Sequence, residues 1–171
     1  MSPRPSHRLD ILAVPADTNA GPIEAIRQLM ADLVDEGVIN PRGRPGPQAA
    51  RWMPQGFAGL RLDLPEPITL YANRQGGFRV HCPVMPDQAI TAAFATAMAD
   101  ARRTERPDQF RFLCPACGES HTLAETIGKP PFRFARLAVQ TIDAEALRPT
   151  EAMVTRLEAA LGPLAWVGVR T

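Results

Sequence analysis

The sequence predicts an α+β fold, with a mixed or antiparallel sheet and about three helices. Apolar segments of strand length lie near both ends of the chain, at residues 8–14, 132–142 and 164–169. Helical patterns follow the first segment, separate the last two, and also occupy residues 88–103. Strands that alternate with helices in this way favour a sheet covered by helices.

The first helix has the clearest pattern. Pro22 suits the first turn of a helix, and Gly37 suits the position after its last turn. Between them, apolar side chains recur at helical spacing on one face. These are Ile23, Ile26, Leu29, Met30, Leu33 and Val34. We expect this face to pack against the core rather than to receive a partner.

Residues 38–67 show no regular pattern. Their first two residues could form a second short strand, and residues 40–47 have the proline- and glycine-rich composition of a loop. Arg42 and Arg44 in this loop could bind phosphate or an acidic partner. A solvated loop with Trp52 folded onto the core is the favoured alternative.

Residues 68–73 and 78–82 have the pattern of a β-hairpin with a turn at 74–77. After this hairpin, Asp87 is a suitable cap for the helix predicted at 88–103. The second arm of the hairpin carries a cysteine at its end, which places that side chain beside the start of the helix.

Arg102 and Arg103, at the end of this helix, have two interpretations. They complement the helix dipole, or they form a basic patch with Arg111 that contacts a partner. Glu105 and Asp108 dilute that patch, so contact with nucleic acid is the less favoured interpretation.

The C-terminal part predicts the longest strand and one more helix. Two prolines at 130–131 break the chain, and residues 132–142 follow as a strand whose alternation shifts once, which indicates a bulge. A helix from residue 150 ends at Gly162, and a final strand at 164–169 completes the chain.

These elements are compatible with a ferredoxin-like α/β sandwich. Strand and helix open the chain, and strand, helix and strand close it. In this interpretation residues 1–171 form a single domain, and a module at about 78–123 is inserted between its two halves.

That module contains the most specific motif of the chain, Cys114-Pro115-Ala116-Cys117-Gly118. Zn²⁺ takes four ligands in a tetrahedron, and two thiolates at this spacing can fill two corners. The glycine allows the tight turn after the second cysteine. Apolar residues before and after the motif predict two short strands hinged at a metal.

This motif resembles one knuckle of a zinc ribbon. Residues 78–86 resemble the second knuckle, because Cys82 and the proline after it stand in the matching places. Met85 occupies the position of the missing cysteine, and a thioether is a poor Zn²⁺ ligand. The resemblance covers residues 78–123, and it implies a structural zinc ion held by Cys82, Cys114 and Cys117.

The fourth ligand has several candidates. His121 lies four residues after Cys117 and is favoured, because imidazole is a common zinc ligand. His81 is the alternative, but neighbours on a strand face opposite ways, so His81 and Cys82 share an ion only if the chain bends. Asp87 offers an oxygen ligand.

Three interpretations without zinc stand beside this one. The ribbon could have lost its metal together with the missing cysteine. Cys114 and Cys117 could form a redox pair, although such a pair usually opens a helix, and a turn and strand are predicted here. Cys82 could be a small buried apolar residue.

Composition limits the classes of function. With 19 basic and 18 acidic residues the net charge is +1, which provides no general attraction to nucleic acid or membranes. Three cysteines, two of them at metal spacing, argue against a disulfide framework and for a reducing compartment. No segment resembles a signal peptide or a membrane span, so a cytoplasmic protein is expected.

These observations favour a non-enzymatic interaction or regulatory module with structural Zn²⁺, acting most readily on a protein partner. A surface around Arg42, Arg44, Arg102 and Arg103 could contact that partner. The first alternative is a nucleic-acid-binding zinc ribbon. The second is an enzyme whose three cysteines leave a zinc position open to water. No glutamate near Cys82 supplies the proton shuttle of zinc deaminases, which disfavours it.

Overall fold

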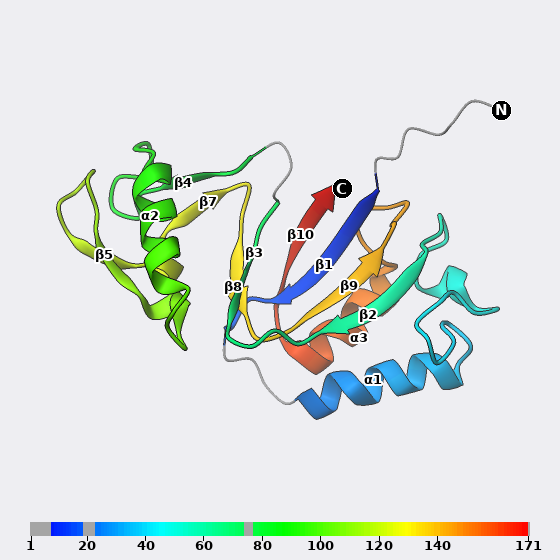
Figure 1. The fold of residues 1–171 in the computed structure, drawn as a ribbon. Coiled ribbons are helices and arrows are strands. Elements are labelled where there is room, and N and C mark those ends of the chain that lie inside the picture. Colours follow the sequence, from blue (N-terminus) through cyan, green and yellow to red (C-terminus); the bar gives the residue numbers. More distant parts are fainter. Residues whose placement is uncertain (1–7, 19–22, 74–76, 171) are drawn as a thin grey trace.

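The computed structural model describes residues 8–18, 23–73 and 77–170, and it confirms the α+β class (Figure 1). These residues contain three α-helices and ten strands. Four strands form one antiparallel sheet, and the other six form three separate two-stranded ribbons. No helix in these ranges is long and apolar enough to cross a membrane.

The main sheet is built from both ends of the chain, with the strand order β10-β1-β9-β2. Helix α1 (Ile23–Asp35) follows β1, and helix α3 (Glu151–Leu161) follows β9. The resulting β-α-β-β-α-β order is that of a ferredoxin-like sandwich, in agreement with the sequence. The four strands are β1 (Leu9–Pro15), β2 (Gly59–Asp63), β9 (Ala138–Ile142) and β10 (Leu164–Arg170).

Both faces of this sheet are covered, and alternate residues of β1 serve different cores. Ile11 and Ala13 pack with the buried faces of α1 and α3. Leu12 and Val14 point to the opposite face, where they pack with Tyr71 and other residues of a second cluster. We call this four-stranded sheet with its two helices the sandwich.

Strand β2 was not predicted, although it completes the sheet. Its sequence, Gly-Leu-Arg-Leu-Asp, has only two apolar residues and lies in the stretch without a pattern. It becomes a strand because it pairs with β9, with Leu60 opposite Thr141. The backbone N–H of Leu60 also donates to the Gly43 carbonyl at 2.7 Å, which fixes the preceding loop against the sheet edge.

Trp52 is folded onto the core as the favoured interpretation expected. It follows a short 3₁₀ helix, Ala49–Arg51, and its side chain is 1% exposed. Its indole Nε1–H donates to the Thr141 hydroxyl at 3.2 Å, so the polar atom of the ring is satisfied inside the core.

Residues 64–137 leave the sheet after β2 and return to it at β9; we call them the inserted segment. Its strands, each three residues long, pair as β3 with β8, β4 with β7, and β5 with β6. Helix α2 (Thr91–Ala101) lies beside them (Figure 1). The strands are β3 (Thr69–Tyr71), β4 (Arg79–His81), β5 (Arg111–Leu113), β6 (Ser120–Thr122), β7 (Ile127–Lys129) and β8 (Arg133–Ala135). Short 3₁₀ turns, Pro107–Gln109 and Leu123–Glu125, complete the segment.

The predicted hairpin of residues 68–73 and 78–82 is therefore wrong. Its arms correspond to β3 and β4, and each of them pairs with a strand from later in the chain. The predicted turn includes residues 74–76, which lie outside the described residues. Alternating apolar residues identified both strands, but the pattern contains no information about the partner.

Two other boundaries differ from prediction. The expected strand 132–142 is divided into β8 and β9, which join different sheets, with Arg136 and Leu137 between them. Helix α2 begins at Thr91 rather than 88, and Asp87 does not cap it. The residues before it cannot be helical because Gln88 and Ile90 exchange backbone hydrogen bonds with the end of β4.

The inserted segment has its own small core. Four phenylalanines, Phe78, Phe94, Phe132 and Phe134, meet in edge-to-face and tilted pairs with ring centroids 5.3–6.4 Å apart. The same cluster includes Cys82, Cys114 and Leu123, each 0% exposed. The cysteines of the motif thus lie at one end of an aromatic core.

Candidate metal centre

Cys82, Cys114, Cys117 and His121 form one cluster, and one ligand atom from each lies within 4.8 Å of all the others. Tetrahedral Zn²⁺ with Zn–S bonds of about 2.3 Å separates its ligand atoms by about 3.8 Å. The four side chains therefore lie where a single tetrahedral ion can contact all of them. Three of the four are buried, so the site is enclosed.

The upstream turn contributes one cysteine to the cluster. Cys82 follows β4, and its N–H donates to the Gln88 carbonyl at 3.0 Å. The backbone N–H of Met85 donates to Cys82 Sγ at 3.3 Å, so the positive end of this N–H dipole points at the sulfur. The Met85 side chain is 42% exposed and lies outside the cluster.

The downstream turn joins β5 and β6. Cys114 donates its N–H to the Glu119 carbonyl at 2.8 Å, and Gly118 donates to the Cys114 carbonyl at 2.9 Å. Gly118 has a φ of 75°, a conformation that residues with a side chain rarely adopt. The glycine closes the turn that brings Cys114 and Cys117 to the same ion position.

His121 is the fourth member of the cluster, as the sequence favoured. It lies on β6 opposite Phe112, is 6% exposed, and its Nε2 is 3.1 Å from Cys117 Sγ. Strand β6 returns antiparallel to β5, so a residue four positions after Cys117 faces the ion position again.

The alternative fourth ligands are not part of the cluster. His81 faces away from Cys82, as neighbours on a strand do, and its Nδ1 is buried without a hydrogen-bond partner among the described residues. Asp87 is exposed and lies outside the cluster. The chain does not bend at His81, because β4 still pairs there with Ile127.

Packing three thiols together affects their ionisation. Burial acts to raise the pKa of Cys82, but hydrogen bonds from the N–H groups of Met85 and Val84 hold it below its ordinary value. The N–H of Glu119 lowers the pKa of Cys117, but burial and the two neighbouring cysteines raise it more. One thiolate thus opposes the next, and a bound cation would offset that repulsion.

Within the described part of the chain, no carboxylate takes part in the cluster. Glu125, which follows β6, accepts a hydrogen bond from the Thr122 N–H at 2.6 Å. That bond, more than any other interaction, lowers the pKa of Glu125, and it forms part of a capping box for the turn at 123–125. Glu125 therefore has a structural role in this turn, and the cluster itself consists of three thiols and an imidazole.

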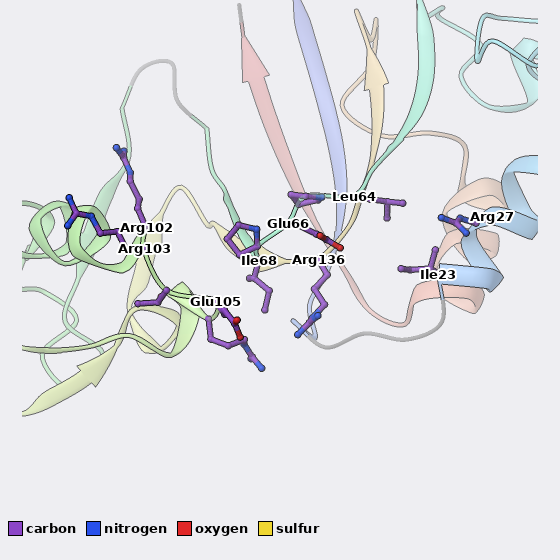
Figure 2. A pocket seen from close by; sticks show the side chains of 13 residues that line it. Ile23, Arg27, Leu64, Glu66, Ile68, Arg102, Arg103, Glu105 and Arg136 are labelled. Atoms are coloured by element: carbon purple, nitrogen blue, oxygen red, sulfur yellow. The ribbon is translucent and has the colours of Figure 1, made fainter.

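The four arginines of the expected partner surface are exposed but are not together. Arg42 lines a shallow groove with Arg61 and part of α1. Arg102 and Arg103 line a different groove, between the end of α2, residues 64–68 and the start of α1 (Figure 2). The structure divides the expected surface into two.

The sequence analysis did not predict most of the residues that line the groove of Arg102 and Arg103. Arg27 and Arg136 also line it, and both had been left without a role. No local signal marks them, since an arginine on a helix and an arginine between two strands look like ordinary solvated residues. Only the crossing of the chain between the sandwich and the inserted segment places them on the same groove as Arg102.

Comparison with protein-family models, with curated proteins and with solved structures found no match. What the cluster and the grooves can do therefore follows from their own residues, distances and charges.

Proposed function

We propose that the cluster of Cys82, Cys114, Cys117 and His121 holds one structural Zn²⁺, and that the protein is a non-enzymatic module that binds another protein. The observation that carries the metal assignment is the enclosed set of four ligand atoms within 4.8 Å of one another. Three thiolates and an imidazole are ligands typical of structural zinc sites, whereas Mg²⁺ and Ca²⁺ prefer oxygen.

A structural role fits the position of the cluster. The inserted segment consists of ribbons with three-residue strands, which are marginal without further support. An ion that joins the end of β4 to the β5–β6 hairpin would add to the small aromatic core at the end where the cysteines lie. In this proposal the two turns are the knuckles of a zinc ribbon in which His121 substitutes for the absent cysteine.

The set of four ligands also argues against a catalytic ion. A catalytic zinc keeps one position open for water or substrate, and here His121 occupies the fourth corner. With all four positions taken by side chains, we expect the function to depend on the outer surface of the protein rather than on the ion. The near-neutral charge of +1 favours a protein partner over nucleic acid, and free thiols suit a reducing, cytoplasmic environment.

The test is the metal content of protein purified without added metal or a histidine tag. We expect about one zinc per chain, lost or strongly reduced in His121→Ala and Cys117→Ser. His81→Ala is the matched control, since it removes an imidazole beside Cys82 that is outside the cluster, and it should keep its zinc. Replacement with Co²⁺ should give the visible absorption of a tetrahedral thiolate site.

Other results would contradict the proposal. Full zinc occupancy in both histidine variants would indicate an open fourth position and favour the enzyme alternative. Absence of metal in the wild-type protein would leave a metal-free ribbon, and Cys114 and Cys117 would then be tested as a redox pair.

A further inference from the structure

A broad groove of about 710 Å³ separates the sandwich from the inserted segment. Ile23 and Arg27 of α1 form one side, and residues 102–106 after α2 form the other. Residues 64–68 and Arg136 lie between them, as Figure 2 shows. None of the lining residues belongs to the metal cluster, so the groove is a separate site.

The groove is basic although the protein is nearly neutral. Five arginines and two glutamates line it, whereas the whole chain has a net charge of +1. Arg106 is already paired within the protein, because its guanidinium donates two hydrogen bonds of 2.8 and 3.0 Å to the buried carboxylate of Asp108. The other four guanidinium groups, those of Arg27, Arg102, Arg103 and Arg136, are exposed and have no ion-pair partner among the described residues.

The same groove exposes apolar side chains. Ile23 is 38% exposed and Leu64 is 37% exposed, and both lie on its lining. These are two of only six large apolar residues that are this exposed in the described part of the chain. Exposed apolar groups beside unpaired cations are typical of contact surfaces.

Another groove, of about 700 Å³, lies along α2 and continues the arginine-lined groove. The two share Pro67, Ile68 and Arg102 as lining residues. The groove along α2 is mainly apolar. It is lined by Leu70, Met98 and phenylalanines of the small core. Together they form one surface that is apolar along α2 and basic where α2 ends.

We propose that this continuous surface binds an extended segment of a protein partner in which bulky apolar side chains are followed by acidic ones. The apolar side chains would lie along α2 over Met98, and the carboxylates would lie among Arg27, Arg102, Arg103 and Arg136. This inference rests on the proposed function, because it names the partner chemistry of a module that binds protein.

The lining favours a polypeptide over nucleic acid. Single strands bind by stacking bases on exposed aromatic faces. Here Phe94 and Phe134 are 2% and 3% exposed and pack against other rings. Phe78 is partly buried and packs edge-to-face with Phe94 and Phe132, so at most one ring of the lining could stack on a base. Glu66 and Glu105 also line the basic half, and they would repel a continuous phosphate backbone, whereas a peptide can place its few carboxylates away from them.

The experiment selects binders from a phage-displayed library of random peptides, using the full-length zinc-loaded protein. We expect the selected peptides to be enriched in Leu, Ile or Phe together with Asp or Glu. Their affinities are then measured by fluorescence polarisation with labelled synthetic peptides, and each peptide is compared with a copy in which Gln and Asn replace the acidic residues. The neutral copies should bind more weakly, and the difference should shrink as salt is added.

Two double variants locate the site. Arg102→Glu with Arg136→Glu should weaken binding about tenfold, because two attractions become repulsions. Arg42→Glu with Arg44→Glu makes the same change in charge outside the groove and should leave the affinity within about twofold. Both proteins should contain as much zinc as the wild type, which excludes an effect through folding of the metal site.

Each other outcome overturns the inference in a distinguishable way. If the selected peptides bind the Arg102/Arg136 double variant with the same affinity as the wild type, the partner binds elsewhere and the proposed function is not contradicted. Failure to enrich any acidic, apolar peptide would contradict the partner chemistry. Tight binding of a mixed-sequence DNA oligonucleotide, lost in that variant, would replace the protein partner with nucleic acid. Loss of zinc would be seen independently in the metal content.

Discussion

The sandwich and the inserted segment hold themselves together by different means. The sandwich has strands of five to seven residues, and side chains such as Ile26, Leu33 and Leu157 are fully buried beneath its helices. In the inserted segment every strand has three residues, and two of its fully buried side chains are Cys82 and Cys114. Where ribbons are too short to enclose a large apolar core, four ligands can take its place.

This contrast predicts that the two parts respond differently to loss of a ligand. Cys114→Ser should cost the inserted segment more than the roughly 5 kcal/mol of the largest core truncations, since zinc binding in small domains is worth about 10–16 kcal/mol. Hydrogen exchange should show rapid exchange of the amides of β5, β6 and α2, with β1 and β9 still protected. Met85→Ser, in the upstream turn beside Cys82 but outside the cluster, should leave exchange unchanged. Equal loss of protection in β1 and β9 would show that the two parts unfold as one unit.

A truncation in the sandwich should have a smaller effect, spread over the whole sheet. Leu157→Ala removes a side chain that is 0% exposed between α3 and the sheet, and should lower the free energy of unfolding by about 3 kcal/mol. Urea denaturation measures this loss, and zinc content should not change. Leu147→Ala is the matched control, because Leu147 is 72% exposed, and its effect should stay within about 0.5 kcal/mol. A similar effect at both positions would contradict the assignment of the core.

The smallest predicted effect is a pH-dependent one within the sandwich. Glu36, just after α1, accepts hydrogen bonds of 2.7 and 2.9 Å from Arg156 of α3 and forms an ion pair with Arg51 at 3.1 Å. The Arg156 guanidinium is the main reason that the pKa of Glu36 lies below its ordinary value of 4.5. Since the folded state prefers the carboxylate, this contact stabilises the protein above pH 4.5, and the stabilisation is lost as the pH falls through the folded pKa.

Glu36→Gln should therefore lower stability near neutral pH, by less than about 1 kcal/mol because the pair is partly exposed. The difference from wild type should disappear in acid, where Glu36 is protonated. Glu24→Gln, at an exposed position in the first turn of α1, is the control for the general effect of removing a charge. Unfolding free energies measured from neutral pH into acid check the prediction, and a difference that persists in acid would contradict it.

Local patterns in the sequence predicted those elements that are determined by residues inside them or directly next to them. The end of α1 follows from Gly37, which has a φ of 74°, whereas Pro22 lies outside the described residues. The turn between β5 and β6 follows from two cysteines separated by Pro115 and Ala116 and closed by Gly118. His121 was favoured as the fourth member because it lies four residues after Cys117, and the antiparallel hairpin returns it to the cluster. The order of strands and helices near the termini also predicted the ferredoxin-like arrangement of the sheet.

Pairing between distant segments could not be predicted in the same way. Strands β3 and β4 alternate correctly, but alternation defines a face and not a partner, and their partners come from residues 127–135. Strand β2 has too few apolar residues to be recognised, and it exists because β9 presents an open edge to it.

By itself, therefore, the sequence determined the α+β class, the amphipathic helices and the tight turn of the Cys-Pro-Ala-Cys-Gly motif, because each depends on residues close together in the chain. The tertiary structure alone decided that β2 joins the sheet, that β3 and β4 pair with β8 and β7 rather than with each other, and that Arg27, Arg102 and Arg136 line one groove. Those outcomes depend on long-range pairing and on the meeting of the sandwich with the inserted segment, which no local pattern encodes.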